Sequence, residues 1–210
     1  MELSGPAVTL VASLVERWPG PWRVGEAGER AALIRRLSRA GVRWFEVPPP
    51  SRAVLRLPQG GGLRYLYWTG GPRDAARVRG GAAGVFLDLG PSGWERLERV
   101  LRVQKGRGEV FLYLPPLEES LALSAASRAL LLGVSRVVST EPGPLVLAFG
   151  PEAVAARVVK GASARRLAAC GARFFLVPVG EVRRVVLELT DLGLDPGVRP
   201  EDLDFLDGED

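Results

Sequence analysis

Eight short runs of apolar, β-branched and aromatic residues recur along the chain, and they restrict its fold more than any other feature. Most of these runs are continuously apolar rather than alternating, which is typical of strands buried on both faces of a sheet. The runs cover residues 8–15, 42–47, 63–68, 85–89, 109–114, 134–139, 144–149 and 173–177. They indicate a parallel sheet whose two faces are covered by other elements.

Helical patterns lie between most of these runs, and several of them stop at a glycine. They cover residues 26–40, 73–79, 92–104, 117–132, 151–169 and 181–192. Apolar residues recur in them at the spacing of one helix face, as expected for helices packed on a sheet. The alternation of strand and helix predicts the α/β class, and eight strands predict a (β/α)8 barrel of the TIM type.

Two connections do not suit a complete barrel. Only residues 140–143 separate the sixth run from the seventh, whereas a parallel crossover needs about a dozen residues or more. Residues 48–62 are rich in proline and glycine, which disfavour a helix between the second and third strands. We therefore expect a shortened or incomplete barrel, formed by residues 1–196 as a single domain and followed by an acidic C-terminal tail, residues 197–210.

Composition excludes several kinds of chemistry. The chain has no histidine and a single cysteine, so Ser-His-Asp and Cys-His catalysis and the usual zinc sites are not available to it. We expect no metal and no cofactor. Its 28 basic residues include only two lysines, Lys105 and Lys160, and asparagine is absent, a bias that suggests a thermophilic source.

Charge and hydropathy bear on partners and location. The arginines are scattered at helical spacing rather than gathered in blocks, so we expect a solvated surface and consider a nucleic-acid partner unlikely. No apolar stretch approaches the ~20 residues that span a bilayer, and the first residues lack a basic leader. We expect a cytoplasmic protein that has no membrane partner and can form a homodimer.

Polar residues near the ends of the predicted strands are the candidates for chemistry, because barrel enzymes place their sites there. Glu46 lies near the end of the second run, Asp88 near the end of the fourth, and Glu181 follows the eighth. Glu46 and Asp88 could form a carboxylate pair for acid–base work. The alternative, which we favour, is that each caps a backbone amide or pairs with an arginine.

Several segments together resemble the type I 3-dehydroquinate dehydratases, which are (β/α)8 lyases of the shikimate pathway. Residues 40–50, AGVRWFEVPPP, resemble the family strand that ends in a glutamate, and Glu46 takes the place of that glutamate. Asp88 in VFLDLG resembles an aspartate of a later family strand. Gly150 and Arg157 keep the spacing of the family element that binds the substrate carboxylate, and Glu181 follows the glycine of the last family turn.

The resemblance implies a substrate-binding set of Glu46, Asp88, Arg157 and Glu181, and a small carboxylate as ligand. It also implies loss of the family reaction, which passes through a lysine imine and needs a histidine to move protons. Leu114 stands at the histidine position, and Val138 or Ser139 at the lysine position. We therefore expect a pseudoenzyme of this family, with no catalytic residue assigned.

Two alternatives stay open from the sequence alone. One is a non-enzymatic interaction or scaffold protein, in which the acidic tail binds a basic partner or covers the chain's own basic body. The other is a lyase- or aldolase-type barrel that works with Glu46 and Asp88.

Overall fold

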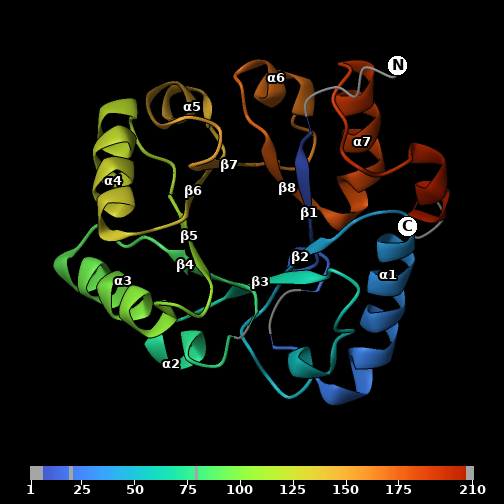
Figure 1. The fold of residues 1–210 in the computed structure, drawn as a ribbon, viewed down its shortest axis with the longest axis horizontal. Helices are drawn as coiled ribbons and strands as arrows, with labels where there is room; N and C mark the ends of the chain where they lie inside the picture. Colours follow the sequence, from blue (N-terminus) through green and yellow to red (C-terminus); the bar gives the residue numbers. More distant parts are fainter. Residues whose placement is uncertain (1–6, 19–20, 79, 207–210) are drawn as a thin grey trace.

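The computed structural model of the chain describes residues 7–18, 21–78 and 80–206. Eight parallel strands pair in the order of the sequence and close into a barrel, and helices surround it as a ring (Figure 1). The strands are β1 (Thr9–Ser13), β2 (Trp44–Val47), β3 (Arg64–Trp68), β4 (Ala82–Phe86), β5 (Glu109–Tyr113), β6 (Arg136–Ser139), β7 (Val154–Arg157) and β8 (Phe174–Pro178). The predicted TIM-type barrel is confirmed.

The surrounding helices follow their strands in turn. The α-helices are α1 (Ala27–Arg39), α2 (Pro72–Ala75), α3 (Pro91–Gln104), α4 (Glu119–Leu132), α5 (Gly143–Phe149), α6 (Ala164–Ala169) and α7 (Val182–Asp191). Short 3-10 helices are η1 (Val24–Glu26), η2 (Val54–Arg56), η3 (Val179–Glu181) and η4 (Pro200–Leu206). Only η2 lies between β2 and β3, in keeping with the prolines and glycines of that connection.

The expectation of an incomplete barrel is wrong, and one misassigned segment explains it. Residues 144–149 form most of α5 instead of a strand, and β7 comes from the start of the segment predicted as a helix over 151–169. A proline in the first turn of α5 favours the helix, and Gly150 with φ +82° ends it. The crossover from β6 to β7 thus spans residues 140–153, which is long enough for parallel pairing.

Two separate apolar clusters hold the barrel together. The outer cluster lies between the strands and the helices, and it includes fully buried Phe45, Ile34 and Leu97. The inner cluster fills the barrel, where Trp44, Phe111 and Phe174 pack edge to face or tilted with ring centroids 5.5–6.1 Å apart. Because successive residues of a strand point to opposite faces, each strand supplies both clusters.

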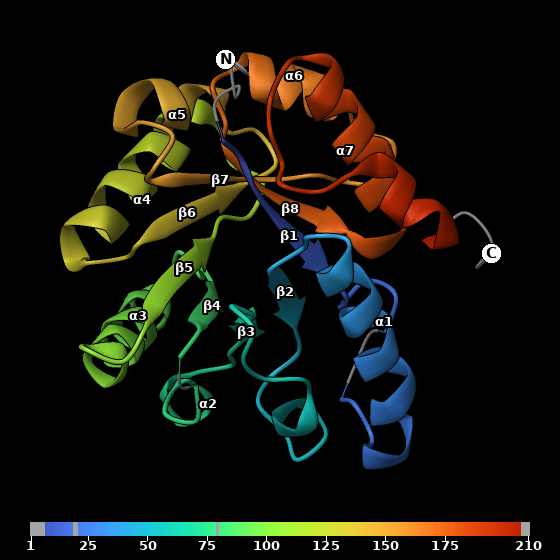
Figure 2. The same cartoon turned by 45° about the vertical axis from the view of Figure 1, so that its right-hand side comes forward.

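The C-terminal segment packs on the barrel as far as residue 206. Leu203 of η4 is fully buried, Asp204 pairs with Arg183 of α7 at 2.9 Å, and the guanidinium of Arg36 lies 3.9 Å from the ring centroid of Phe205. Figure 2 shows this segment beside α7. Residues 207–210 of the predicted tail lie outside the described residues, and the division at residue 196 stays a prediction.

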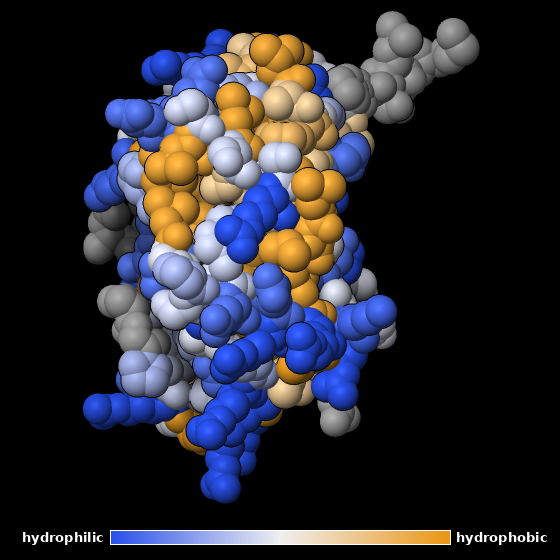
Figure 3. Space-filling view, turned by 90° about the vertical axis from the view of Figure 1, so that its left-hand side faces the viewer, coloured by the Kyte–Doolittle hydropathy of each residue, from blue (hydrophilic) through white to orange (hydrophobic). Residues whose placement is uncertain are grey.

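The outer surface differs from helix to helix. In α3 five of 14 residues are charged, whereas α4 has two in the same length and exposes Leu121, Leu131 and Leu132. Figure 3 looks at the left-hand side of Figure 1, where α4 lies above α3. Apolar residues gather on the upper part of this side and hydrophilic residues below. No helix in the described part of the chain combines the length and the apolar character needed to cross a bilayer.

Gly41 gives a test of how the turn before β2 packs. Its φ is +111°, and a Cβ added there would lie 2.2 Å from the carbonyl oxygen of Gly197. We expect Gly41→Ala to lower the free energy of unfolding by more than ~2 kcal/mol, from strain and steric clash combined. Denaturant unfolding measures this. The control is Gly106→Ala, where φ is +74° but the space is open, so only the strain of about 1 kcal/mol is expected.

Candidate functional site

The carboxyl ends of the strands gather polar side chains on the barrel axis, around Glu46. Glu46 is the third residue of β2, so it shares the inward face with Trp44, while Phe45 and Val47 face the helices. It pairs in register with Ser13 of β1 and Leu66 of β3. We call the end of the barrel at which the strands terminate the mouth. Barrel closure places the Glu46 carboxylate inside it, and the exposed fraction of Glu46 is zero.

One oxygen of Glu46 accepts hydrogen bonds from two neighbours. Trp68 Nε1 donates to Oε1 at 2.8 Å, and the hydroxyl of Tyr113 donates to the same oxygen. Arg157 Nη1 forms an ion pair with it at 3.6 Å. These three partners come from β3, β5 and β7, so the carboxylate connects strands around the whole barrel.

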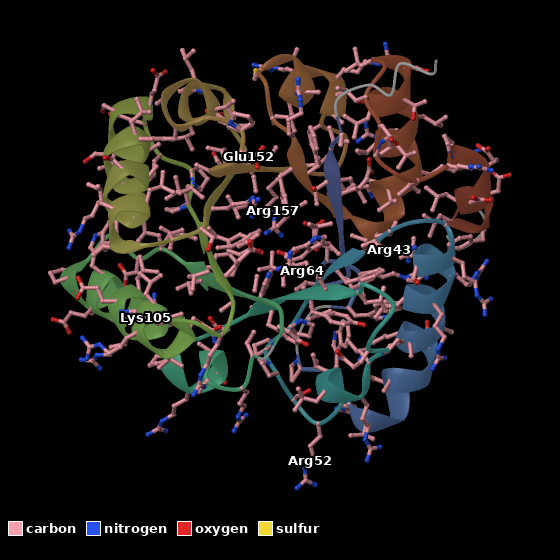
Figure 4. The ribbon with its side chains drawn as sticks, in the orientation of Figure 1. Arg43, Arg52, Arg64, Lys105, Glu152 and Arg157 are labelled. Carbon is pink, nitrogen blue, oxygen red and sulfur yellow. The ribbon has the colours of Figure 1, made fainter. Side chains whose placement is uncertain are left out.

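Arg157 ends β7 and points toward the barrel axis (Figure 4). Its Nη2 donates to Oε1 of Glu16, from the loop after β1, at 3.2 Å, and its guanidinium lies 5.5 Å from the ring centroid of Tyr113 and 5.8 Å from that of Trp68. Burial acts to lower the pKa of Arg157, but the negative charge of Glu46 leads the effects that raise it, and the net shift is upward. The group stays a cation at all physiological pH values.

The ring of Tyr113 packs between Gly84 of β4 and the half-exposed ring of Phe86. A Cβ at Gly84 would meet its ring at 2.7 Å, so β4 needs glycine here. Phe86 stacks on Tyr113 at 4.7 Å and meets Trp68 edge-on at 4.9 Å, and it is 45% exposed. Burial raises the pKa of Tyr113 well above its usual value, and the charge of Glu46 adds to this, so the phenol stays protonated.

Two buried polar atoms of the mouth form no hydrogen bond with any described residue. They are Oε2 of Glu46 and Oγ of Ser13, which belong to register partners on adjacent strands. Buried polar groups normally have hydrogen-bond partners. Two neighbouring atoms without one therefore indicate a place for a water molecule or a polar group of a ligand. The carboxylate is therefore held through Oε1, while Oε2 has no partner among the described residues.

The four residues predicted from the sequence divide into two groups. Glu46 and Arg157 meet in the mouth, although Arg157 was expected on a helix. Asp88 lies at the same end of the barrel but is exposed, and its Oδ1 accepts a hydrogen bond from the backbone N–H of Gly90 at 3.0 Å. Glu181 pairs with Arg184 of α7 at 2.6 Å, in a network outside the barrel.

Sequence reasoning missed Ser13, Trp68 and Tyr113. Each is the last residue of its strand and carries a polar atom, and Tyr113 has the same parity as the interior residue Phe111. They could have been identified as residues that carry a polar atom, end a predicted strand and, by the alternation of side chains, point into the barrel. Within the described residues no group of three His, Cys, Asp or Glu side chains is placed to hold a metal ion.

Neither lysine lies on a strand of the barrel. Lys105 is in the turn between α3 and β5, at the other end of the barrel. Lys160 is exposed in the loop after β7, which corrects the expectation that it lies inside a helix. The inward residue of β6 nearest the mouth is Val138, which is buried among apolar neighbours.

All three tyrosines of the chain give a pH-dependent test. Burial is the leading cause that raises the pKa values of Tyr65, Tyr67 and Tyr113. Since the folded pKa values exceed the unfolded ones, their contribution to stability is complete below about pH 10 and is lost as pH rises beyond it. We expect little tyrosinate absorbance from the folded protein at about pH 10.5, and a melting temperature that falls steeply above about pH 10. Normal titration of the folded protein would contradict this.

Comparison with protein-family models gives no match, and comparison with curated protein sequences gives none. Solved structures that share the fold include the following three. An aldolase designated QR15 has a TM-score of 0.62 at 14% identity, over 90% of this chain and 100% of its own. A 2,3-dimethylmalate lyase has a TM-score of 0.54 at 15% identity, over 97% and 91%. Dihydrodipicolinate synthase from Agrobacterium tumefaciens has a TM-score of 0.56 at 13% identity, over 95% and 79%. The chain is thus a TIM-type barrel, and similarity at this level establishes the fold alone.

Proposed function

We propose that the mouth around Glu46 is the acid–base centre of a lyase-type barrel enzyme. The observation that carries the proposal is the asymmetry of the carboxylate, whose Oε1 has three partners while Oε2 has none among the described residues. A base must be fixed in position and still have a lone pair available, and this arrangement supplies both. The site also lies at the end of the barrel where enzymes of this fold work.

Glu46 and its hydrogen-bond donor Tyr113 together complete a proton cycle. In an elimination, Oε2 of Glu46 takes a proton from carbon, the electrons of that C–H bond form a double bond, and a hydroxyl leaves. The hydroxyl takes the proton of Tyr113 and departs as water. The abstracted proton rests on Oε2 of Glu46, whereas Tyr113 is bonded to Oε1, so the carboxyl group must turn to bring the protonated oxygen to the phenolate and return the proton. The raised pKa of Tyr113 keeps this acid protonated between turnovers.

The chemistry needs no imine. A Schiff base requires a lysine at the reacting carbon, and neither lysine lies on a strand: Val138 takes the inward position of β6, and Lys160 is exposed in the loop after β7. The structural neighbours named as an aldolase and a lyase favour this class of reaction by analogy of fold only. Access requires a side chain to move, and half-exposed Phe86 above Tyr113 is the obvious one.

We further propose that the substrate is a small carboxylate held by Arg157. The guanidinium is already paired with Glu46 and Glu16, so a ligand must replace one of them. Glu46 is fully buried, whereas the side chain of Glu16 is 40% exposed and can move into water. The carboxylate of the ligand would therefore take the place of Glu16 on Nη2.

This exchange predicts that Glu16→Gln binds small carboxylates more tightly than the unmodified chain. Because the ligand no longer has to displace Glu16, its binding free energy becomes more favourable by up to ~1 kcal/mol, the value of a partly exposed ion pair. This lowers Kd by about fivefold. Calorimetric titration with malate measures it. Glu141→Gln, in the loop after β6 at the same end, is the matched control and should leave Kd unchanged. Weaker binding by Glu16→Gln would contradict the exchange.

The acid–base role predicts enzyme-dependent hydrogen exchange at carbon. We expect at least one acid in a panel of small hydroxy- and oxo-acids to exchange a C–H proton in deuterium oxide, followed by NMR. Glu46→Gln should lower the rate by about a hundredfold or more. Asp88→Asn, an exposed carboxylate at the same end of the barrel, should stay within about twofold of the unmodified rate. Equal rates in Glu46→Gln and Asp88→Asn, with both folded, would exclude Glu46 as the base.

A second candidate function is a non-catalytic relative of the type I 3-dehydroquinate dehydratases. What supports it is the apolar lining at two strand ends, where Val138 is buried inside the barrel and Leu114 follows β5. Such a protein would bind the family's acids without converting them. A higher melting temperature with 3-dehydroquinate, with no turnover and no adduct trapped by borohydride, would favour it over the lyase proposal.

A further inference from the structure

The end of the barrel opposite the mouth carries an excess of positive charge. We define the basic rim as the turns that enter β2, β5, β6, β7 and β8, together with the first residues of β3, β5 and β6. It contains six basic residues and two acidic ones, which leaves a net charge of +4. The basic residues are Arg43, Arg64, Lys105, Arg107, Arg136 and Arg173, and the acidic ones are Glu109 and Glu152.

The described loops of the mouth end are neutral, and counting the last residue of each strand, as first residues are counted in the basic rim, adds only the cation Arg157. The described loops between each strand and the next helical element contain four basic and four acidic residues. These are Arg17, Arg23, Arg52 and Lys160 against Glu16, Asp88, Glu118 and Glu141. The positive charge of the chain is therefore not spread evenly, because the fold gathers at one end basic residues that are far apart in the sequence.

The two acidic residues of the basic rim are already paired. Glu109 contacts Arg64 at 3.4 Å and Arg136 at 3.5 Å, and Glu152 contacts Arg136 at 3.9 Å. Arg64 stacks on Trp44 with its guanidinium 4.1 Å from the ring centroid, and in Figure 4 it lies near the barrel axis. Arg64 and Arg136 thus form the floor of the barrel.

The other four cations have no such compensation. Arg43, Lys105, Arg107 and Arg173 form no ion pair with any described residue. Arg43 and Arg173 donate only to backbone carbonyls, at 2.9 Å and 2.8 Å, so their charges remain unneutralised. They stand on three separate turns around the barrel instead of converging on one point.

Two broad grooves open on the same end. One of about 580 Å³ lies between the turns that enter β5 and β6, and its lining includes the cations Arg102 and Lys105, the acid Glu98 and the small residues Gly106, Gly108 and Ser135. The other, of about 410 Å³, is lined by Arg43, Trp44 and the segment 196–198. Each groove therefore has a cation at its edge, and small residues in the first let an extended chain approach the backbone.

We propose that the basic rim binds the phosphodiester backbone of a single-stranded nucleic acid. Unpaired cations spaced around a grooved surface suit an anion that repeats along a chain better than one isolated phosphate. The helical spacing of the arginines in the sequence favours a solvated surface, but the barrel gathers at one end the turns that carry basic residues. The proposal is independent of the acid–base site, which lies at the other end.

Fluorescence anisotropy with a labelled oligothymidylate of about 30 nucleotides tests the basic rim. Four phosphate contacts on a single strand predict that log K falls with log salt concentration at a slope of about −3. Lys105→Glu with Arg107→Glu should raise Kd by about tenfold or more and make the slope shallower by about 1.4. The pair Arg52→Glu and Lys160→Glu, at the mouth end, makes the same change of charge and should alter Kd by less than about twofold.

Three results would overturn the proposal. The first is no binding at low salt. The second is equal weakening by the pair of substitutions at the basic rim and the control pair, which would mean that net charge alone attracts the strand. The third is complete competition by inorganic phosphate at millimolar concentration, which would indicate a site for a single anion. Melting temperatures of both double variants identify any loss of folding.

Discussion

The buried carboxylate of Glu46 is the constraint on which the mouth of the barrel depends. An ionised group with no exposed surface is tolerated only if partners replace the water that it has lost. Trp68, Tyr113 and Arg157 do so, and each must stand at the end of a different strand to reach the same oxygen. Removing one partner of such a group typically lowers the free energy of unfolding by about 3–5 kcal/mol. Glu46 and its three partners therefore act as a unit.

The inner apolar cluster separates this unit from the other end of the barrel. Trp44, Phe111 and Phe174 form a layer between the floor arginines and the mouth, and Leu66, Val138 and Leu176 continue it. The rings and aliphatic chains leave charged groups only at the two ends. The ion pairs of the mouth and those of the floor therefore share no partner, and a substitution at one end leaves the contacts of the other in place.

Much of the fold could be predicted from the sequence, and the exception has a physical reason. Continuous apolar runs located seven of the strands, because a strand buried on both faces must be apolar throughout, although the fourth run, residues 85–89, overlaps β4 only at residues 85 and 86. Residues 144–149 have the same character but form most of α5, since a six-residue apolar run does not by itself distinguish a buried strand from a short helix. The length required by a parallel crossover is what decides between them, and it favours the helix.

The site was harder to predict than the fold, because its members meet only through barrel closure. Glu46 could be found as a charge in an apolar strand, but Tyr113 and Trp68 look like ordinary strand residues until register and parity are known. The same closure gathers the turn cations on the basic rim. Arg64 and Arg136 are committed to Glu109 and to the aromatic layer, so their substitution would disturb the fold. The turn residues Lys105 and Arg107 have no such structural duty, and their charges can be changed to examine binding alone.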